Sequence, residues 1–179
     1  MHANSYQLFK KHALPLITSD MDVLEISPDE PGEPYAIRDL LSKCKYYFAC
    51  IDNKPLVPLS MVPMLSEYSF DCQDETYDVV LSANVAEHVR KLWRWFKEQA
   101  RITKPGGLVI SVSPMSWPYH ACPMDCWRIY PDGYRALFDE VGLEVIHTSC
   151  ESLVPIEEGW RHEHGDSPVW DTIAIGRKL

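Results

Sequence analysis

No apolar run in this sequence approaches the roughly 20 residues that a membrane-spanning helix needs. The first residues also lack the basic start, apolar middle and small-residue cleavage site of a signal peptide. Basic residues are fewer than acidic ones: the chain has 17 Lys and Arg and 26 Asp and Glu, which gives a formal net charge of −9. An acidic surface repels phosphate backbones and anionic lipid headgroups. We therefore expect no nucleic-acid partner, no membrane partner and a cytoplasmic location.

Closely spaced cysteines are nearly absent too. Four of the six stand singly within or beside apolar stretches, where a thiol packs as a small hydrophobic group: Cys44, Cys50, Cys72 and Cys150. This usage fits thiols in a reducing compartment rather than a disulfide framework. A chain of 179 residues, 46% of them hydrophobic, can bury a core without disulfides, and we expect one domain over residues 1–179.

Helix and strand periods alternate along the chain. Short apolar runs bounded by turn residues predict strands over residues 22–26, 46–52, 77–82, 108–113, 143–148 and 171–176. Helical spacing predicts helices over residues 6–13, 37–44, 85–100 and 131–141, with Lys104-Pro-Gly-Gly107 ending the third. The proline-rich stretch 53–76 predicts a loop with one short strand near residues 68–70. This order indicates an α/β fold with a mainly parallel sheet covered on both faces.

Ligands of open α/β sheets bind beyond the carboxyl ends of the strands. The loop that follows the first predicted strand starts near Glu25, and Asp52 ends the second. A carboxylate at position 52 is well placed to accept two hydrogen bonds from a ribose diol. It is equally compatible with a solvated strand-end residue, and the position favours neither.

Four segments occur in a recognisable order. They are VLEI at residues 23–26, YDVVLSANVAEHV at 77–89, ITKPGGLVI at 102–110 and DTIAIGR at 171–177. Together they resemble the class I S-adenosylmethionine-dependent methyltransferases, in particular the methyltransferase type 11 group. The resemblance covers most of the chain from about residue 21. It implies a doubly wound, Rossmann-like methyltransferase sheet, mainly parallel with an antiparallel last strand, and S-adenosylmethionine as the cofactor.

The resemblance also implies which residues line the cofactor site. Glu25, Asp52 and the turn around Asn84 would contact the cofactor, and the loop that starts at Asp71 would contact its adenine.

The loop after Glu25 departs from the family pattern. The family usually has Gly-x-Gly after the acidic residue, whereas this chain has Ser27 and Asp29 at those positions. A side chain at position 27 narrows the approach to the cofactor. The Asp29 carboxylate either binds the cofactor's amino group or crowds its carboxylate. We expect both residues to lie at the cofactor.

The loop over residues 114–130 follows the fifth strand of the resemblance, at the ligand edge. Aromatic side chains with a few polar groups are typical of a small-molecule pocket, and we expect Tyr119, Trp127 and Arg128 to bind the substrate. His120 is the expected general base, because its ordinary pKa lies near neutrality, and Asp125 is expected to orient its imidazole. The alternative is a packed loop in which Asp125 and Arg128 simply pair.

The predicted function is methyl transfer from S-adenosylmethionine to a small molecule. The specific reaction that we expect is O-methylation of a sugar or another hydroxylated metabolite. Residues 1–20 form an N-terminal helix or cap, and residues 114–130 form the substrate-side loop. The alternative is a non-catalytic, methyltransferase-like partner or scaffold protein, which the loss of both loop glycines favours. A dinucleotide-binding oxidoreductase is disfavoured, because no Gly-x-Gly-x-x-Gly follows the first strand.

Two further features leave alternatives open. His120, Cys122 and Cys126 could form part of a zinc cluster with a histidine from the segment RHEH at 161–164, but their spacing is irregular and we expect no metal. The residues Trp93, Trp95 and Trp117 fit either the face of a homodimer or the core.

Overall fold

The structure is a computed structural model, and it describes residues 1–28, 33–50, 61–121, 123–154 and 168–179. A central sheet has the strand order β2-β1-β5-β6-β8-β7. Its strands are β1 (Asp22–Ile26), β2 (Lys45–Ala49), β5 (Tyr77–Ala83), β6 (Thr103–Pro114), β7 (Leu143–Glu151) and β8 (Asp171–Lys178). The helices are α1 (Ala3–Leu8), α2 (Ile37–Leu40), α3 (Leu92–Ile102) and α4 (Pro131–Glu140).

The sheet confirms the predicted fold class. Strands β2, β1, β5 and β6 run parallel, whereas the last strand, β8, runs antiparallel between β6 and β7. The inner strands are apolar on both faces; in β1, for example, Val23, Leu24 and Ile26 are fully buried. Such strands need a cover on each side. The α/β alternation in the sequence therefore produces layers of helices above and below the sheet.

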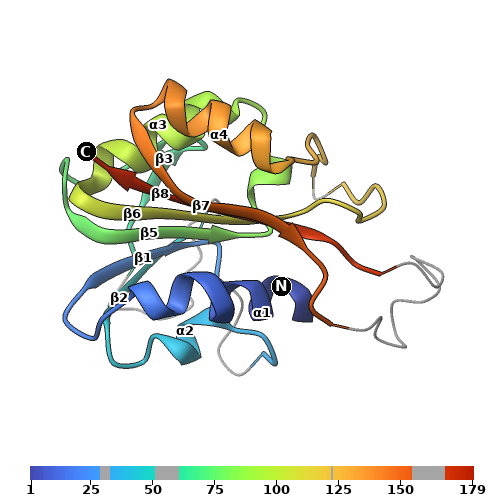
Figure 1. Ribbon diagram of the computed structural model, residues 1–179. Helices are drawn as coiled ribbons and strands as arrows, with labels where there is room; N and C mark the ends of the chain where they lie inside the picture. The colour runs from blue at the N-terminus through green and yellow to red at the C-terminus, as the bar shows by residue number, and fades with distance from the viewer. Residues whose placement is uncertain (29–32, 51–60, 122, 155–167) are drawn as a thin grey trace.

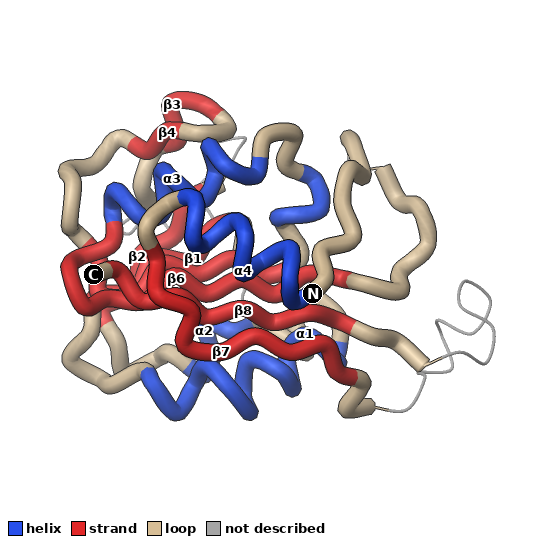
Figure 2. Tube along the Cα trace, turned by 45° about the horizontal axis from the view of Figure 1, so that its top comes forward, coloured by secondary structure: helices blue, strands red, loops and turns tan. Residues whose placement is uncertain are grey.

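The two faces carry different helices (Figure 1). Helices α3 and α4 cover one face, where Trp95 and Phe96 pack with Tyr134 and Phe138. Helices α1 and α2 cover the other, with the buried side chains of Leu8 and Phe9 from the N-terminal segment and Ile37 from α2. A small hairpin of β3 (Met64–Ser66) and β4 (Ser69–Phe70) lies beside α3, as Figure 2 shows.

The predicted start and end of the third helix are both wrong, and the helix predicted over residues 37–44 ends at Leu40. The helix predicted from Val85 is interrupted, because Ala86–His88 form a 3-10 turn and α3 begins only at Leu92. The segment predicted to end that helix, Lys104-Pro-Gly-Gly107, is already part of β6, and the helix ends at Ile102. A Cβ atom on Gly107 would lie 2.7 Å from the carbonyl oxygen of Asp78, so the close approach of β5 and β6 requires glycine there.

The N-terminal helix begins earlier than predicted and changes character along its length. It runs as α1, continues as a π-helical turn over Phe9–Ala13 and ends in a 3-10 turn over Leu14–Leu16, which contains Pro15. The Nδ2 atom of Asn4 donates to the carboxylate of Asp171 at the start of β8 (2.8 Å). This contact brings the first residues of the chain to the edge of the sheet where β6 ends. None of the helices in the described ranges has the length and apolar character that a bilayer crossing needs.

Candidate active site

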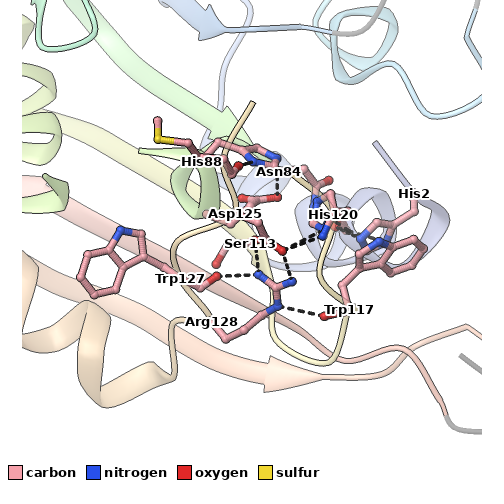
Figure 3. Close-up of polar contacts among 12 residues, drawn as sticks. His2, Asn84, His88, Ser113, Trp117, His120, Asp125, Trp127 and Arg128 are labelled. Carbon is pink, nitrogen blue, oxygen red and sulfur yellow. Dashed lines mark hydrogen bonds and ion pairs between the residues drawn. The ribbon is translucent and has the colours of Figure 1, made fainter. Parts of the chain in front are cut away.

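A pocket of about 350 Å³ opens where β5 and β6 end. This is the edge at which ligands of parallel α/β sheets bind. Figure 3 shows several of its side chains converging from β5, the loop after β6 and the N-terminus. The lining residues are Met1, His2, Asn84, Glu87, His88, Pro114, Trp117 and His120.

Glu25 and Ser27 lie at the end of β1, next to β5 in the sheet. The Glu25 side chain is buried, and the hydroxyl of Tyr46 on β2 donates to its Oε2 (2.6 Å). Ser27 has a φ of 54°, in the left-handed region that favours glycine, and its N–H donates to the carbonyl oxygen of Ala49 (2.7 Å). The backbone thus takes a glycine-like conformation at this family position although the residue is serine.

Asn84 follows β5 and also has a left-handed backbone, with a φ of 55°. Asparagine tolerates this conformation better than most residues. Its N–H donates to the carbonyl oxygen of Val112 on β6 (2.8 Å), which fixes the turn at the strand end. The Oδ1 atom is buried and has no hydrogen-bond partner among the described residues. It can therefore accept a hydrogen bond from a ligand.

Glu87 is a site residue that the sequence analysis did not single out. Its side chain is fully buried, and neither carboxylate oxygen has a hydrogen-bond partner in the described part of the chain. Burial raises the pKa of this carboxyl to about 8. Nε2 of the neighbouring His88 lies 3.8 Å from Oε1. The only sequence signal was the Glu-His pair itself, directly after the fourth-strand segment.

The loop over residues 114–130 brings His120 to the pocket. Its Nδ1 lies 3.0 Å from the carbonyl oxygen of Pro118 and 3.3 Å from Oδ2 of Asp125. Asp125 also accepts from the backbone N–H of His120 (2.9 Å) and from two N–H groups of Arg128. The Arg128 guanidinium holds the pKa of Asp125 low, at about 2. The arrangement brings together the predicted base and the residue predicted to orient it.

Arg128 is fully engaged within its own loop. Besides Asp125, its guanidinium donates to the carbonyl oxygens of Trp117, Pro118 and Trp127 (Figure 3). The pairing of Asp125 and Arg128, the alternative that the sequence left open, is thus present. A substrate contact from Arg128 stays a prediction, and in this conformation it would require the guanidinium to give up one of these bonds.

The two aromatic residues predicted to bind substrate lie outside the pocket lining. Tyr119 is 78% exposed. The indole N–H of Trp127 donates to the carbonyl oxygen of Val89 (2.7 Å), and its ring lines a separate, largely apolar cavity between α3 and α4 together with the half-exposed Trp93. Both stay predicted substrate contacts. Trp95 is fully buried and belongs to the core rather than to a dimer face.

Asp71 lies toward the other end of the sheet. Its neighbours Phe70 and Cys72 both accept hydrogen bonds from Arg101 near the end of α3, and the segment then leads to the start of β5. Glu25, by contrast, pairs with Leu81 near the end of β5. The structure therefore does not bring Asp71 together with the other predicted cofactor residues.

Several predicted residues lie outside the described ranges. They include two predicted cofactor contacts, Asp29 and Asp52, and, for the zinc alternative, Cys122 and the histidines at 162 and 164. Trp117, the third tryptophan considered for a dimer face, lines the pocket and stacks on the His2 ring with centroids 4.8 Å apart.

Comparison with known proteins agrees with this fold. A family model described as a methyltransferase domain matches residues 50–111. Over 64 residues the chain is 44% identical to an uncharacterized methyltransferase of Mycolicibacterium gilvum, a match that covers 35% of this chain and 25% of that relative. The chain thus spans only a quarter of the length of this curated relative.

Solved structures show the same fold over nearly the whole chain. An S-adenosylmethionine-dependent methyltransferase from Mesorhizobium loti superposes with a TM-score of 0.65 at 11% identity, covering 98% of both chains. A Haemonchus contortus phosphoethanolamine N-methyltransferase 2 in complex with S-adenosyl-L-methionine gives a TM-score of 0.65 at 12% identity, covering 98% of this chain and 52% of that one. The signature segments, the matched methyltransferase model and the fold thus agree with one another, and the chain is similar to the class I S-adenosylmethionine-dependent methyltransferases, in particular the methyltransferase type 11 group, whose cofactor is S-adenosylmethionine.

Proposed function

We propose that this chain transfers a methyl group from S-adenosylmethionine to a hydroxyl group of a small molecule, a sugar or another hydroxylated metabolite. The observation that carries the proposal is the orientation of His120 in the pocket wall. Its Nδ1 faces the Pro118 carbonyl oxygen and the Asp125 carboxylate, at the edge of the sheet where Glu25, Ser27 and Asn84 also lie.

The residues at the ends of β1 and β5 fit the family's cofactor. Ser27 and Asn84 both have left-handed backbones, and Oδ1 of Asn84 is a buried acceptor without a partner among the described residues. An amino group such as that of the methionine moiety can satisfy such an acceptor. Glu25, Ser27 and Asn84 would hold the cofactor, together with Asp29 and Asp52. When bound, S-adenosylmethionine supplies a methyl group on a positively charged sulfur.

His120 would act on the acceptor hydroxyl. A carbonyl oxygen only accepts hydrogen bonds, so the contact with Pro118 places the ring proton on Nδ1 and leaves a lone pair on Nε2. Nε2 would take the hydroxyl proton as the oxygen becomes a nucleophile. Asp125, 3.3 Å from Nδ1, would stabilise the imidazolium that forms. Tyr119, Trp127 and Arg128 remain proposed contacts for the rest of the acceptor.

A non-catalytic partner or scaffold protein is the second candidate. The observation that favours it is the Ser27 side chain at a position where the family has glycine, on a backbone that glycine adopts without strain. The two candidates differ in cofactor binding, because a degenerate loop would bind neither S-adenosylmethionine nor its product.

Calorimetric titration of the chain with S-adenosylmethionine and S-adenosylhomocysteine tests the first step. Micromolar binding supports the enzyme, whereas no binding by the folded protein favours the scaffold. Methyl transfer to a panel of sugars and polyols, assayed with a chelator present, then tests the base. His120→Ala should lower turnover at least 100-fold while the Kd for S-adenosylhomocysteine stays within about threefold. His147→Ala, on the outer strand β7, is the matched control, and equal turnover in His120→Ala would remove His120 as the base.

The homodimer is a further proposal. Trp93 is 48% exposed on α3 and would contribute to its face. Sedimentation equilibrium of the chain and of Trp93→Ser measures the oligomeric state, and a monomeric wild-type chain at micromolar concentration would rule the dimer out.

A further inference from the structure

Three groups that commonly bind metals meet in the pocket wall. One potential ligand atom from each of Glu87, His88 and His120 lies within 4.8 Å of the others. We propose that these residues bind a divalent first-row transition-metal ion through the Glu87 carboxylate and the Nε2 atoms of His88 and His120. This goes beyond methyl transfer, and the ion site does not depend on it.

The two histidines are held in the tautomer that a metal ion needs. Nδ1 of His88 is hydrogen-bonded to the carbonyl oxygen of Met124, and Nδ1 of His120 to that of Pro118. Because a carbonyl oxygen only accepts, each ring carries its proton on Nδ1 and keeps a lone pair on Nε2. Histidine ligands of metal ions typically donate their other ring N–H in this way. The hydrogen bonds that would orient both histidine ligands are therefore already present.

Glu87 supplies a fully buried carboxyl group whose oxygens accept no hydrogen bond from the described residues. A buried polar group without a hydrogen bond is costly, and ionising it in this place is disfavoured unless a cation is close by. The charge of Arg128 favours the ionised form of Glu87, but within the described residues the hydrogen bonds of its guanidinium go to Asp125 and to carbonyl oxygens rather than to the Glu87 oxygens. A bound cation would stabilise the ionised form of Glu87 and contact its oxygens directly.

The ligand chemistry selects the class of ion. Two imidazoles and one carboxylate suit Zn²⁺, Fe²⁺, Mn²⁺ or Co²⁺, whereas Mg²⁺ and Ca²⁺ prefer oxygen ligands. Ligands about 2.0–2.2 Å from one ion lie roughly 3–4 Å apart. The observed spread of at most 4.8 Å therefore needs side-chain shifts of about 1 Å. Coordination positions facing the 350 Å³ pocket would stay open for water or substrate.

A second cluster of the same composition provides an internal control. His12, His147 and Glu151 also bring their ligand atoms within 4.8 Å. There, however, the carboxylate is already neutralised, because Lys11 donates to Oε2 of Glu151 (2.6 Å) and His12 Nε2 lies 2.7 Å from Oε1. We expect this cluster to bind the ion much more weakly or not at all.

Ion binding has a consequence for catalysis that rests on the proposed function. Nε2 of His120 cannot hold the ion and accept a proton at the same time, because both use one lone pair. Saturating Zn²⁺ should then lower methyl transfer at least tenfold, and a chelator should restore it.

The test is a titration of the chelator-treated full chain with Co²⁺, followed through the visible absorption of the bound ion, and with Zn²⁺ by calorimetry. One ion should bind per chain, and Glu87→Gln and His120→Ala should each weaken binding at least tenfold. His12→Ala and Glu151→Gln should leave it within about twofold. The readout needs neither cofactor nor acceptor, so its failure is distinct from failure of methyl transfer.

Three results would overturn the ion site. They are no binding by the wild-type chain, unchanged affinity in Glu87→Gln, or loss of binding in Glu151→Gln. Glu87→Gln preserves the shape of the side chain, and a cooperative melting curve will establish that each variant is folded. A rise in the Tm of the wild type with Zn²⁺ that is absent in Glu87→Gln would support the site by a second measurement.

Discussion

Arg128 donates two hydrogen bonds to Asp125, one from Nη1 to Oδ1 (2.5 Å) and one from Nη2 to Oδ2 (2.7 Å). The Asp125 side chain is only 2% exposed. The same guanidinium donates to the carbonyl oxygens of Trp117 and Pro118, and Asp125 accepts from the backbone of His120. One ion pair thus links both arms of the loop that positions His120.

Arg128→Lys tests this role, because lysine keeps the charge but loses the planar, two-pronged contact. We expect the free energy of unfolding to fall by about 1–3 kcal/mol, the range for losing hydrogen bonds to a charged group. Urea unfolding followed by tryptophan fluorescence measures it. Arg135→Lys is the matched control, since the Arg135–Asp132 pair has the same spacing but is exposed, and it should change little. Equal losses in both variants would contradict a structural role for Arg128.

The backbone at Ser27 leads to a second prediction. Its φ of 54° is strained for serine, and its Cβ narrows the approach to the end of β1. Ser27→Gly should therefore tighten the binding of S-adenosylmethionine about threefold to tenfold by calorimetry, a gain of up to about 1.4 kcal/mol. Glu75→Gly is the control, because Glu75 has a φ of 55° but precedes the start of β5, away from the pocket. If Ser27→Gly raised the free energy of unfolding but left the Kd for S-adenosylmethionine unchanged, the prediction would be wrong. The strain at Ser27 would then affect the stability of the chain and not cofactor binding.

The strands of this fold were predictable because their signal is local. The apolar run predicted over residues 77–82 is β5, Tyr77–Ala83, and the run over 22–26 is β1. The break before α3 was not predictable by spacing. Val85 and Val89 are both buried and fit one helical stripe with Leu92, yet the chain turns at Asn84 and again before Leu92. Apolar spacing records which side chains are buried but not whether one continuous helix buries them.

The site was only partly predictable, because its decisive contacts join distant segments. His120 and Asp125 lie five residues apart in one loop, and the sequence analysis predicts that Asp125 orients the His120 imidazole. Glu87 is contacted from the loop after β6, where the N–H of Cys126 donates to the Glu87 carbonyl oxygen (2.7 Å). No pattern near residue 87 indicates a partner 39 positions away. The same holds for Asn4 and Asp171, which lie 167 positions apart.

Asp171 makes the stability of the protein depend on pH. It is fully buried, and burial raises its pKa to about 7, although Asn4 and Ser5 donate to it. In the unfolded chain its pKa is about 4, so the folded state holds this proton more tightly. The free energy of unfolding should therefore fall as pH rises from about 4 to about 7, and this decline should level off above pH 7.

Asp171→Asn removes this titration. Between pH 5 and pH 8 the Tm of the variant should decline less than that of the wild type, with the raised pKa of Glu87 accounting for a remaining slope. Differential scanning calorimetry at a series of pH values measures the difference. Asp125→Asn should keep the wild-type slope in this interval, because the pKa of Asp125 lies near 2. Parallel curves for Asp171→Asn and the wild type would mean that Asp171 stays ionised throughout.

Gly107 tests how tightly β5 and β6 approach each other. A Cβ atom there would lie 2.7 Å from the carbonyl oxygen of Asp78, 2.8 Å from Cγ2 of Thr103 and 2.9 Å from the carbonyl oxygen of Lys104. Two of these three atoms are backbone, so a side chain cannot simply rotate away. Gly107→Ala should lower the free energy of unfolding by about 1–3 kcal/mol through overpacking.

Gly133→Ala in α4 is the matched control. The nearest atom to its Cβ would be Cγ2 of Ile129 at 3.2 Å, and alanine favours a helix over glycine by about 1 kcal/mol. Its free energy of unfolding should therefore stay within about 1 kcal/mol of the wild type or rise, because the gain in helix propensity offsets the contact. Guanidinium unfolding of the three chains in parallel compares them. The opposite result would be a Gly107→Ala chain as stable as the wild type and a Gly133→Ala chain with a lower free energy of unfolding. The space between β5 and β6 would then accommodate a Cβ atom at position 107. Of the two adjacent glycines, only Gly106 would need to be glycine, because its φ is +79°.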